Sequence, residues 1–333
     1  MNNITIMVLL ILLLASSSCE KPFKGYKFER GSLPETPVNL SDFNTAYDDY
    51  NSTAPSLGFL LPFCFSTNRN SQGNEFDIIY QPMNVNFDKT TGILKVTNEY
   101  DNWGIYMNDY EIIKTGLTKI TTTGNEFGPN LIPAYSSNKY NFTLLYSTDI
   151  TGNSQINFTS NKTDENFSEP EEVSFLNSEF EDMYPAFNSG RTKLNFCSNR
   201  NGARFDFYFV NVNPETDIEL LLSENLSYEI FRDTVLSSSS DDKCPFFFED
   251  KMVFASNREG GYGGYDLYYS ILGNGIWCEP INFGETINTE FDEFRPVLID
   301  EGVSQTQTMM VFSSNRPGGL GGFDLYFVGI AKE

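Results

Sequence analysis

The sequence contains no histidine, and this absence excludes several kinds of catalytic and metal site. Serine–histidine triads, cysteine–histidine dyads and zinc sites of the H-E-x-x-H type all need an imidazole as base or ligand. A catalytic centre in this chain would have to use carboxylates, hydroxyls or thiols instead.

Basic residues are scarce. The chain has 22 Lys and Arg against 45 Asp and Glu, which gives a net charge of −23. Binding to a nucleic-acid backbone or to an anionic lipid surface requires cationic side chains, so the charge argues against both partners. It permits a basic partner or a cation, and solubility alone also accounts for it.

Long apolar runs are absent after the first, Ile4–Ala15, which is too short to span a bilayer. The run ends in Ser16-Ser17-Ser18-Cys19, which resembles a lipoprotein processing site. We expect residues 1–18 to be a signal peptide, Cys19 to be acylated, and residues 19–35 to begin with this cysteine and form a tether. The lipid anchor would then hold the protein in the cell envelope, at the outer membrane. An ordinary secretory signal with a coincidental cysteine is the alternative.

Four cysteines follow Cys19, and their spacings give no disulfide framework. We expect buried free thiols at Cys64, Cys197, Cys244 and Cys278.

Two stretches of the chain are near-copies of each other. F-A-S-N-R-E-G-G-Y-G-G-Y-D-L-Y-Y occupies 254–269, and F-S-S-N-R-P-G-G-L-G-G-F-D-L-Y-F occupies 312–327, a displacement of 58 residues (312 − 254). Each copy reads as a short strand, a polar exit, a glycine-rich turn and a second strand. Hairpins that repeat at this period are typical of β-propeller blades.

Weaker copies lie at 65–80, 146–158 and 196–208, so the chain contains five units. A proline precedes each hairpin, at Pro55, Pro129, Pro185, Pro245 and Pro296. The first spacing, 74 residues (129 − 55), exceeds the next, 56 (185 − 129), and predicts a hairpin insertion near 82–120.

A second phrase marks the joins between units. E-P-I-N-F-G followed by I-N-T-E-F-D-E begins at Glu279, and similar phrases begin at Glu169 and Pro37. The chain therefore enters its first unit with the end of a blade, while its last unit stops after a third strand. We predict an all-β fold with a single five-bladed propeller over 36–333, of about four strands per blade, closed by the N-terminal strand at 36–40. Closure of this kind removes both exposed sheet edges.

The hairpin and the join phrase together resemble the TolB-type, WD-repeat-like (PD-type) propellers of envelope lipoproteins from Bacteroidetes-like bacteria. The similarity covers nearly all of the chain after residue 35. The similarity does not extend to the separate α/β domain of TolB itself or to the OmpA-like domain of many relatives. The resemblance implies a binding module of the envelope, without cofactor or metal.

Two polar series recur within the hairpins. An Asp enters the third strand of four units, and an Arg leaves the second strand of the same units; both are missing from unit two. We expect the Asp side chains to accept hydrogen bonds from turn amides and to pair with the Arg of the same hairpin. The residues are Asp77, Asp206, Asp266, Asp324, Arg69, Arg200, Arg258 and Arg316.

A third series is acidic and lies three residues before the unit proline. It predicts a ring of carboxylates at one end of the propeller, at Glu126, Asp182, Asp242 and Glu293. Such a ring could bind a cation or a basic loop, although no D-x-D-x-D loop supports calcium. A structural role, in turn capping or in pairing with the Arg series, is the preferred interpretation of the ring.

Two classes of function remain. The first is a non-enzymatic scaffold that binds an envelope protein or a glycan, and the repeat-bound position of the acidic residues favours it. The second is a glycosidase-like enzyme, which would need two carboxylates in unlike surroundings. We expect the scaffold, with no catalytic residue.

Overall fold

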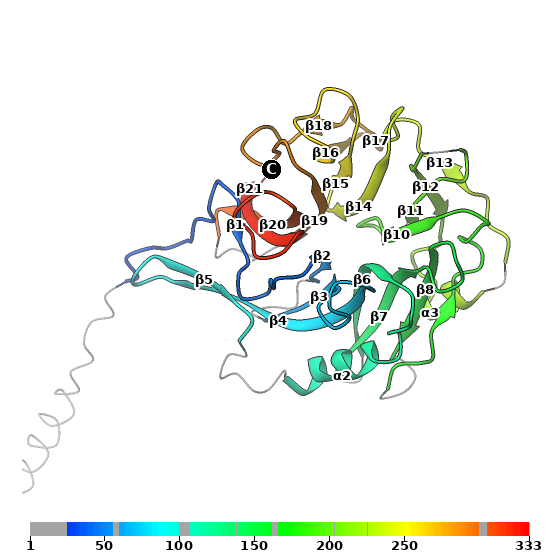
Figure 1. The fold of residues 1–333 in the computed structure, drawn as a ribbon, viewed down its shortest axis with the longest axis horizontal. Helices are drawn as coiled ribbons and strands as arrows, with labels where there is room; N and C mark the ends of the chain where they lie inside the picture. The colour runs from blue at the N-terminus through cyan, green and yellow to red at the C-terminus, as the bar shows by residue number, and fades with distance from the viewer. Residues whose placement is uncertain are drawn as a thin grey trace, which may run out of the picture.

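The chain folds as a five-bladed β-propeller in a computed structural model that describes residues 25–55, 60–99, 107–136, 139–161, 166–202, 204–224, 226–299 and 305–332. Each blade is an antiparallel sheet, and the five sheets stand around a central axis (Figure 1). The predicted fold class is confirmed.

The first two blades follow each other along the chain, each running from its innermost strand outward. Blade one contains β2 (Asp49–Thr53), β3 (Leu60–Thr67), β4 (Asp77–Asp88) and β5 (Ile93–Thr97). Blade two contains β6 (Glu126–Ser136), β7 (Lys139–Thr148), β8 (Gln155–Ser160) and β9 (Glu171–Glu172).

The other three blades keep this order. Blade three contains β10 (Asp182–Phe187), β11 (Lys193–Ser198), β12 (Asp206–Asn211) and β13 (Phe231–Arg232). Blade four contains β14 (Asp242–Phe248), β15 (Lys251–Ser256) and β16 (Asp266–Gly273), with β17 (Ile276–Trp277) and β18 (Ile281–Asn282) both paired to β16. Blade five contains β19 (Glu293–Ile299), β20 (Gln307–Ser314), β21 (Asp324–Ala331) and β1 (Val38–Asn39).

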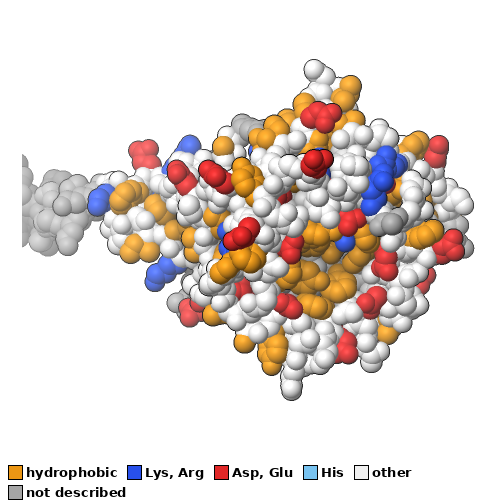
Figure 2. All heavy atoms as spheres, turned by 45° about the horizontal axis from the view of Figure 1, so that its top comes forward, with side chains coloured by type: hydrophobic (Ala, Val, Ile, Leu, Met, Phe, Trp, Pro, Cys, Tyr) orange, Lys and Arg blue, Asp and Glu red, His pale blue; other side chains and the backbone are white. Residues whose placement is uncertain are grey.

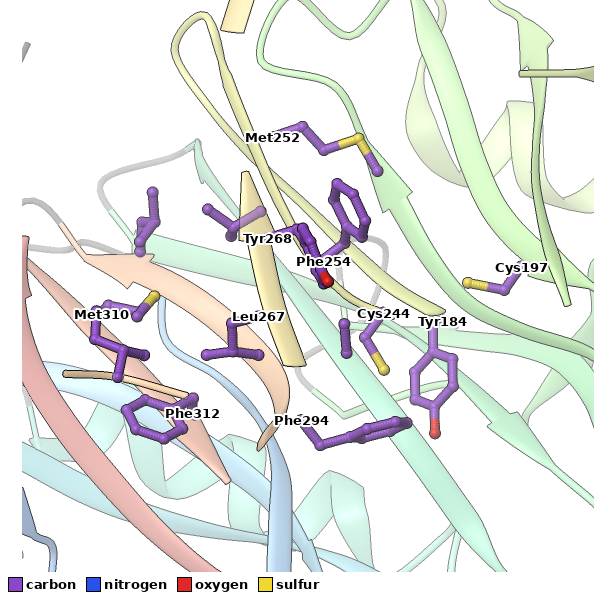
Figure 3. Packing of buried hydrophobic residues seen from close by; sticks show 14 of the residues in the cluster. Tyr184, Cys197, Cys244, Met252, Phe254, Leu267, Tyr268, Phe294, Met310 and Phe312 are labelled. Atoms are coloured by element: carbon purple, nitrogen blue, oxygen red, sulfur yellow. The ribbon is translucent and has the colours of Figure 1, made fainter. Parts of the chain in front are cut away.

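The core lies between the faces of neighbouring blades. The second strand of each blade has neighbours on both faces, so successive residues are buried instead of alternate ones, as at Phe254 and Ala255 of β15. Figure 3 shows this packing where Phe254 and Tyr268 of blade four face the space between blades. The cluster continues into blade five through Met310 and Phe312.

The N-terminal strand closes the ring as predicted. β1 pairs antiparallel with β21, with Val38 opposite Phe327 and Asn39 opposite Tyr326. The Leu40 amide then donates to the Leu325 carbonyl at 2.9 Å. This closure pairs the edge of β21, which would otherwise present unpaired backbone groups to solvent.

The long first unit departs from the expected insertion. The hairpin β4–β5 supplies the outer strand that blade one needs, so it is not additional to the four strands. The added element is α2 (Met107–Leu117), which packs against β4 and β7; the other helix of the described residues, α3 (Ile218–Ser223), lies in blade three before β13. Ile113 and Leu117 are the buried side of α2.

The four later cysteines are free thiols. Cys64, Cys197 and Cys244 are buried, whereas Cys278 is exposed, because it follows the short edge strand β17. Cys19 and the predicted signal peptide lie outside the described residues. Within the described residues, the helices are too short or too polar to cross a membrane.

Truncation tests the closure. Deleting residues 20–30 should leave the melting temperature within about 2 °C, since these residues precede the closing strand. Deleting 36–50 removes β1 and the start of β2, so the protein should unfold or oligomerise through the open edge of β21. Thermal melts with size-exclusion chromatography would measure both, and equal stability of the two truncations would contradict the closure.

Candidate functional site

The predicted ring of carboxylates exists, and its members are fully buried. Glu126, Asp182, Asp242 and Glu293 each begin the innermost strand of a blade and are 0% exposed. A fifth member, Asp49, begins β2 and was missed.

Asp49 was missed because blade one has Ser52 in the place of the unit proline, and Pro55 lies three residues later. A hydroxyl residue four positions ahead of each carboxylate would have revealed Asp49. Thr45, Ser178 and Thr289 donate both their backbone amide and their hydroxyl to the carboxylate that follows them.

Four of the five carboxylates are paired with the arginines that leave the second strands. The Nη2-to-oxygen distances are 2.5–2.9 Å in the pairs Arg69–Asp49, Arg200–Asp182, Arg258–Asp242 and Arg316–Glu293. Each carboxylate has an exposed fraction of 0%, and each pair is therefore shielded from solvent on the acidic side. A cation at these positions would have to displace a guanidinium, so the ring serves structure here.

The expected pairing of these arginines with Asp77, Asp206, Asp266 and Asp324 is wrong. In three of the four, Arg200, Arg258 and Arg316, the guanidinium lies over two rings, as Arg258 does over Phe254 at 5.0 Å and Tyr268 at 4.9 Å; Arg69 lies over Phe65 alone. The guanidinium Nη2 also donates to a carbonyl of the preceding join, which for Arg258 is that of Leu236 at 2.9 Å. The carbonyl contact places the guanidinium beside the start of the first strand, where the ring carboxylate lies.

The third-strand aspartates instead hold the turn and the outer strand. Asp266 accepts from the amides of Tyr262 and Gly263 and from the Asn282 side chain. Asp324 has the corresponding contacts with Leu320, Gly321 and Asn39. Asp206 is paired with Arg232 at 2.8 Å, and Asp77 accepts from Asn70 at 3.3 Å.

Glu126 differs from the other ring members because Ile150 stands where they have an arginine. Its Oε1 accepts from the hydroxyls of Thr122 and Thr148, while its Oε2 has no hydrogen-bond partner. Burial without a cation raises the pKa of Glu126 from 4.5 to about 7.

The pH dependence of stability tests this difference. The pKa of Glu126 is higher in the folded state than in the unfolded chain. The contribution of Glu126 to the free energy of unfolding is therefore full below about pH 4.5 and is lost as the pH rises to about 7. The wild type should lose about 1–3 kcal/mol of unfolding free energy over this range. Glu126→Gln should not lose it, and should therefore be more stable than the wild type at pH 8. Urea unfolding between pH 4.5 and 8 would measure it.

Two variants serve as controls for that experiment. Asp182→Asn leaves Arg200 without its partner, so it should cost about 1–3 kcal/mol at pH 8. Ile150→Arg supplies the missing guanidinium and should flatten the pH dependence as Glu126→Gln does. A Glu126→Gln profile parallel to that of the wild type would contradict the assignment.

A second polar series joins each blade to the one before it. The residue ahead of each ring carboxylate accepts a hydrogen bond from the backbone amide of the residue that precedes the neighbouring third strand, at 2.7–3.0 Å. The backbone amide of the ring carboxylate residue donates a second hydrogen bond, to the carbonyl of the residue that precedes the neighbouring third strand, at 2.7–2.9 Å. The acceptors are Asp48, Asn125, Glu181, Asp241 and Asp292, and the residues they hold are Phe323, Phe76, Ser154, Phe205 and Tyr265, in that order.

These joins gather aromatic side chains at one end of the central channel. We call this group the aromatic cluster: Tyr50, Phe76, Phe127, Tyr184, Phe205, Tyr265, Phe294 and Phe323. Neighbouring rings are 5.0–6.1 Å apart, as in Tyr50–Phe76 and Tyr184–Phe294. Six of its members are only partly buried, which leaves ring surface facing the channel mouth.

Charged groups border the aromatic cluster. Asp241 accepts from the Tyr265 hydroxyl at 2.9 Å, and Lys243 Nζ lies 4.0 Å from the centre of the Phe205 ring. Burial and the bond to Asp241 raise the pKa of Tyr265. On the face shown in Figure 2, apolar side chains gather toward the middle of the propeller and acidic ones are scattered around them.

The acceptors at the joins are not equivalent. Asp48 and Asp292 use both carboxylate oxygens in hydrogen bonds to backbone and asparagine amides. Glu181 accepts one bond, from the Ser154 amide to Oε2, and Asp241 accepts from the Phe205 amide and the Tyr265 hydroxyl. Asp241 thus also uses both of its oxygens, and Glu181 Oε1 is the join carboxylate oxygen without a hydrogen bond to the described residues.

Below the aromatic cluster, each innermost strand carries a β-bulge whose residue is left-handed. The φ angles of Asn51, Gly128, Tyr184, Cys244 and Arg295 lie between 49° and 59°. Two constraints require glycine at position 128: the positive φ angle, and the Cβ of any other residue, which would stand 2.4 Å from Cδ1 of Tyr184.

Across the described residues, Cys, Asp and Glu do not gather into a group of three that could hold a metal ion.

The comparisons with known proteins return glycoside hydrolases. An exo-β-1,3-galactanase from Phanerochaete chrysosporium is 10% identical, covers 89% of this chain and 63% of its own, and has a TM-score of 0.50. The exo-β-1,3-galactanase 1,3Gal43A from Clostridium thermocellum gives the same four values. The catalytic domain of a GH62 α-L-arabinofuranosidase from Coprinopsis cinerea has 10% identity, coverage of 91% and 98%, and a TM-score of 0.46.

No family model matches the chain. No curated protein matches it either. At 10% identity the likeness to the galactanases establishes the propeller fold alone. The predicted resemblance to TolB-type lipoproteins is nevertheless wrong, because the propellers matched at a TM-score of 0.50 are galactanases. The expected non-enzymatic scaffold is contradicted by the same finding.

Proposed function

We propose that the protein is a carbohydrate-active enzyme of the glycoside hydrolase type, which binds a glycan at the aromatic cluster. The observation that carries the proposal is a combination at one end of the channel: partly exposed rings, the Glu181 carboxylate with Oε1 free of hydrogen bonds to the described residues, and the Asp241 carboxylate bonded to the Tyr265 hydroxyl. Apolar faces with a few convergent polar groups are typical of small-molecule sites. The fold is compatible with this chemistry, since the two galactanases named above have the same propeller.

Glu181 and Asp241 carry the proposed chemistry. Glycosidic cleavage uses one carboxylic acid to protonate the leaving oxygen and a second carboxylate as nucleophile or as base toward water. Glu181 has a free oxygen and takes the acid role, while Asp241 is oriented by the Phe205 amide and the Tyr265 hydroxyl and takes the second role. The two residues belong to neighbouring blades and have different partners, as such a pair requires.

Turnover on a panel of glycans tests the proposal. The panel should include arabinose- and galactose-containing polysaccharides and their aryl glycosides. Glu181→Gln and Asp241→Asn should each lower kcat by about 10²–10⁴-fold, because each removes one proton-transfer group. Their melting temperatures should stay within a few degrees of the wild type.

Glu179→Gln is the matched control, since Glu179 is exposed and lies two residues from Glu181. It should keep full activity. Absence of turnover on the whole panel, or full activity in both Glu181→Gln and Asp241→Asn, would overturn the proposed function.

We further propose that the protein is a lipid-anchored envelope protein, which would place the channel mouth near envelope or extracellular glycans. The support is the apolar run 4–15 and the small residues before Cys19. Cys19→Ala should release the protein from the membrane fraction, as measured by fractionation after a high-salt wash. A Cys19→Ala protein that still sediments with membranes would rule out this anchor.

A further inference from the structure

Arg295, in the middle of the channel, is a buried cation without a counter-charge among the described residues. It is 1% exposed and stands among the largest fully buried side chains. Its Nη2 donates to the Pro129 carbonyl at 2.8 Å and its Nε to the Ser52 carbonyl at 3.4 Å. Its Nη1 has no hydrogen-bond partner, and the ion pairs of the described residues do not include it.

Unpartnered polar atoms of β2 accompany this guanidinium. Both side-chain atoms of Asn51 and the hydroxyl of Ser52 are buried and lack hydrogen bonds. Arg295 extends from blade five to the Pro129 carbonyl of blade two and also contacts the Ser52 carbonyl. Its guanidinium therefore lies next to the strand that carries these unpartnered atoms. Buried donors normally have partners, which makes a cluster of orphans in one channel a sign of a missing ligand.

The electrostatics select the sign of that ligand. Burial lowers the pKa of Arg295, and an uncompensated buried charge costs several kcal/mol. The cavity of about 170 Å³ between β6, β10 and β14 is lined by neither Arg295 nor Asn51, so it is separate from these groups.

We propose that a small monovalent anion of halide size binds in the channel, with Arg295 Nη1 and the Asn51 side-chain amide as its donors. The inference is independent of the proposed glycan site. A buried water could satisfy the hydrogen bonds, but only an anion neutralises the guanidinium as well.

Thermal melting of the purified protein with different anions is the test. Sodium chloride, bromide and formate should be compared with sulfate at constant ionic strength. Chloride and bromide should raise the melting temperature by about 3–8 °C at a hundredfold excess over the dissociation constant. A rise with formate alone would identify a carboxylate as the occupant of the same site. Indifference to all three anions would overturn the proposal.

Three variants locate the effect. Arg295→Met and Asn51→Gly should each abolish the chloride dependence, and glycine at position 51 accepts the φ of 56° without strain. Arg204→Met removes a surface charge whose side chain is 47% exposed, and should keep the dependence. An equal chloride effect in Arg295→Met and the wild type would place the anion elsewhere and refute the site.

Bromide soaked into crystals of the wild type keeps the test decisive if both channel variants fail to fold. Its anomalous signal should lie within hydrogen-bond distance of Arg295 Nη1 and Asn51 Nδ2. Anomalous density that is absent from the channel would overturn the proposal.

Discussion

The propeller depends on a two-bond join that occurs once between each pair of neighbouring blades. At every join, a side-chain oxygen accepts the amide of one backbone residue, and the next residue donates its own amide to the carbonyl of that same residue. Both polar groups of that residue are satisfied where the sheet cannot satisfy them. The angle between blades is therefore set by hydrogen bonds, and the apolar packing between the blades fills the space that these bonds define.

Much of this architecture follows from the sequence. The near-copies at 254–269 and 312–327 indicate the period, and the join phrase at Pro37 indicates that an N-terminal strand completes the last blade. These features could be predicted because the same local geometry recurs and must be met by the same residue types. The resemblance to a known family misled, since a hairpin that suits one propeller also suits another with a different function.

The partners of the charged residues were harder to predict. Arg200 lies six residues (206 − 200) from Asp206 and eighteen (200 − 182) from Asp182, yet it pairs with the more distant one. Sequence distance could not reveal that the guanidinium, which lies over Phe196 and Tyr208, also reaches the Leu176 carbonyl beside Asp182. The aromatic cluster was missed for a related reason. Tyr50 and Phe323 read as ordinary strand residues, and only closure of the ring brings their rings to 5.6 Å.

The closing strand has a consequence for how the molecule is made. Val38 pairs with Phe327, 289 positions (327 − 38) later along the chain. During synthesis β1 therefore has no partner strand until the residues of β21 have been added. Contacts between such distant positions carry a large entropic cost and slow folding. Until β21 has been made, the blades can therefore form only an open arc, and the ring is completed after the last strand is available.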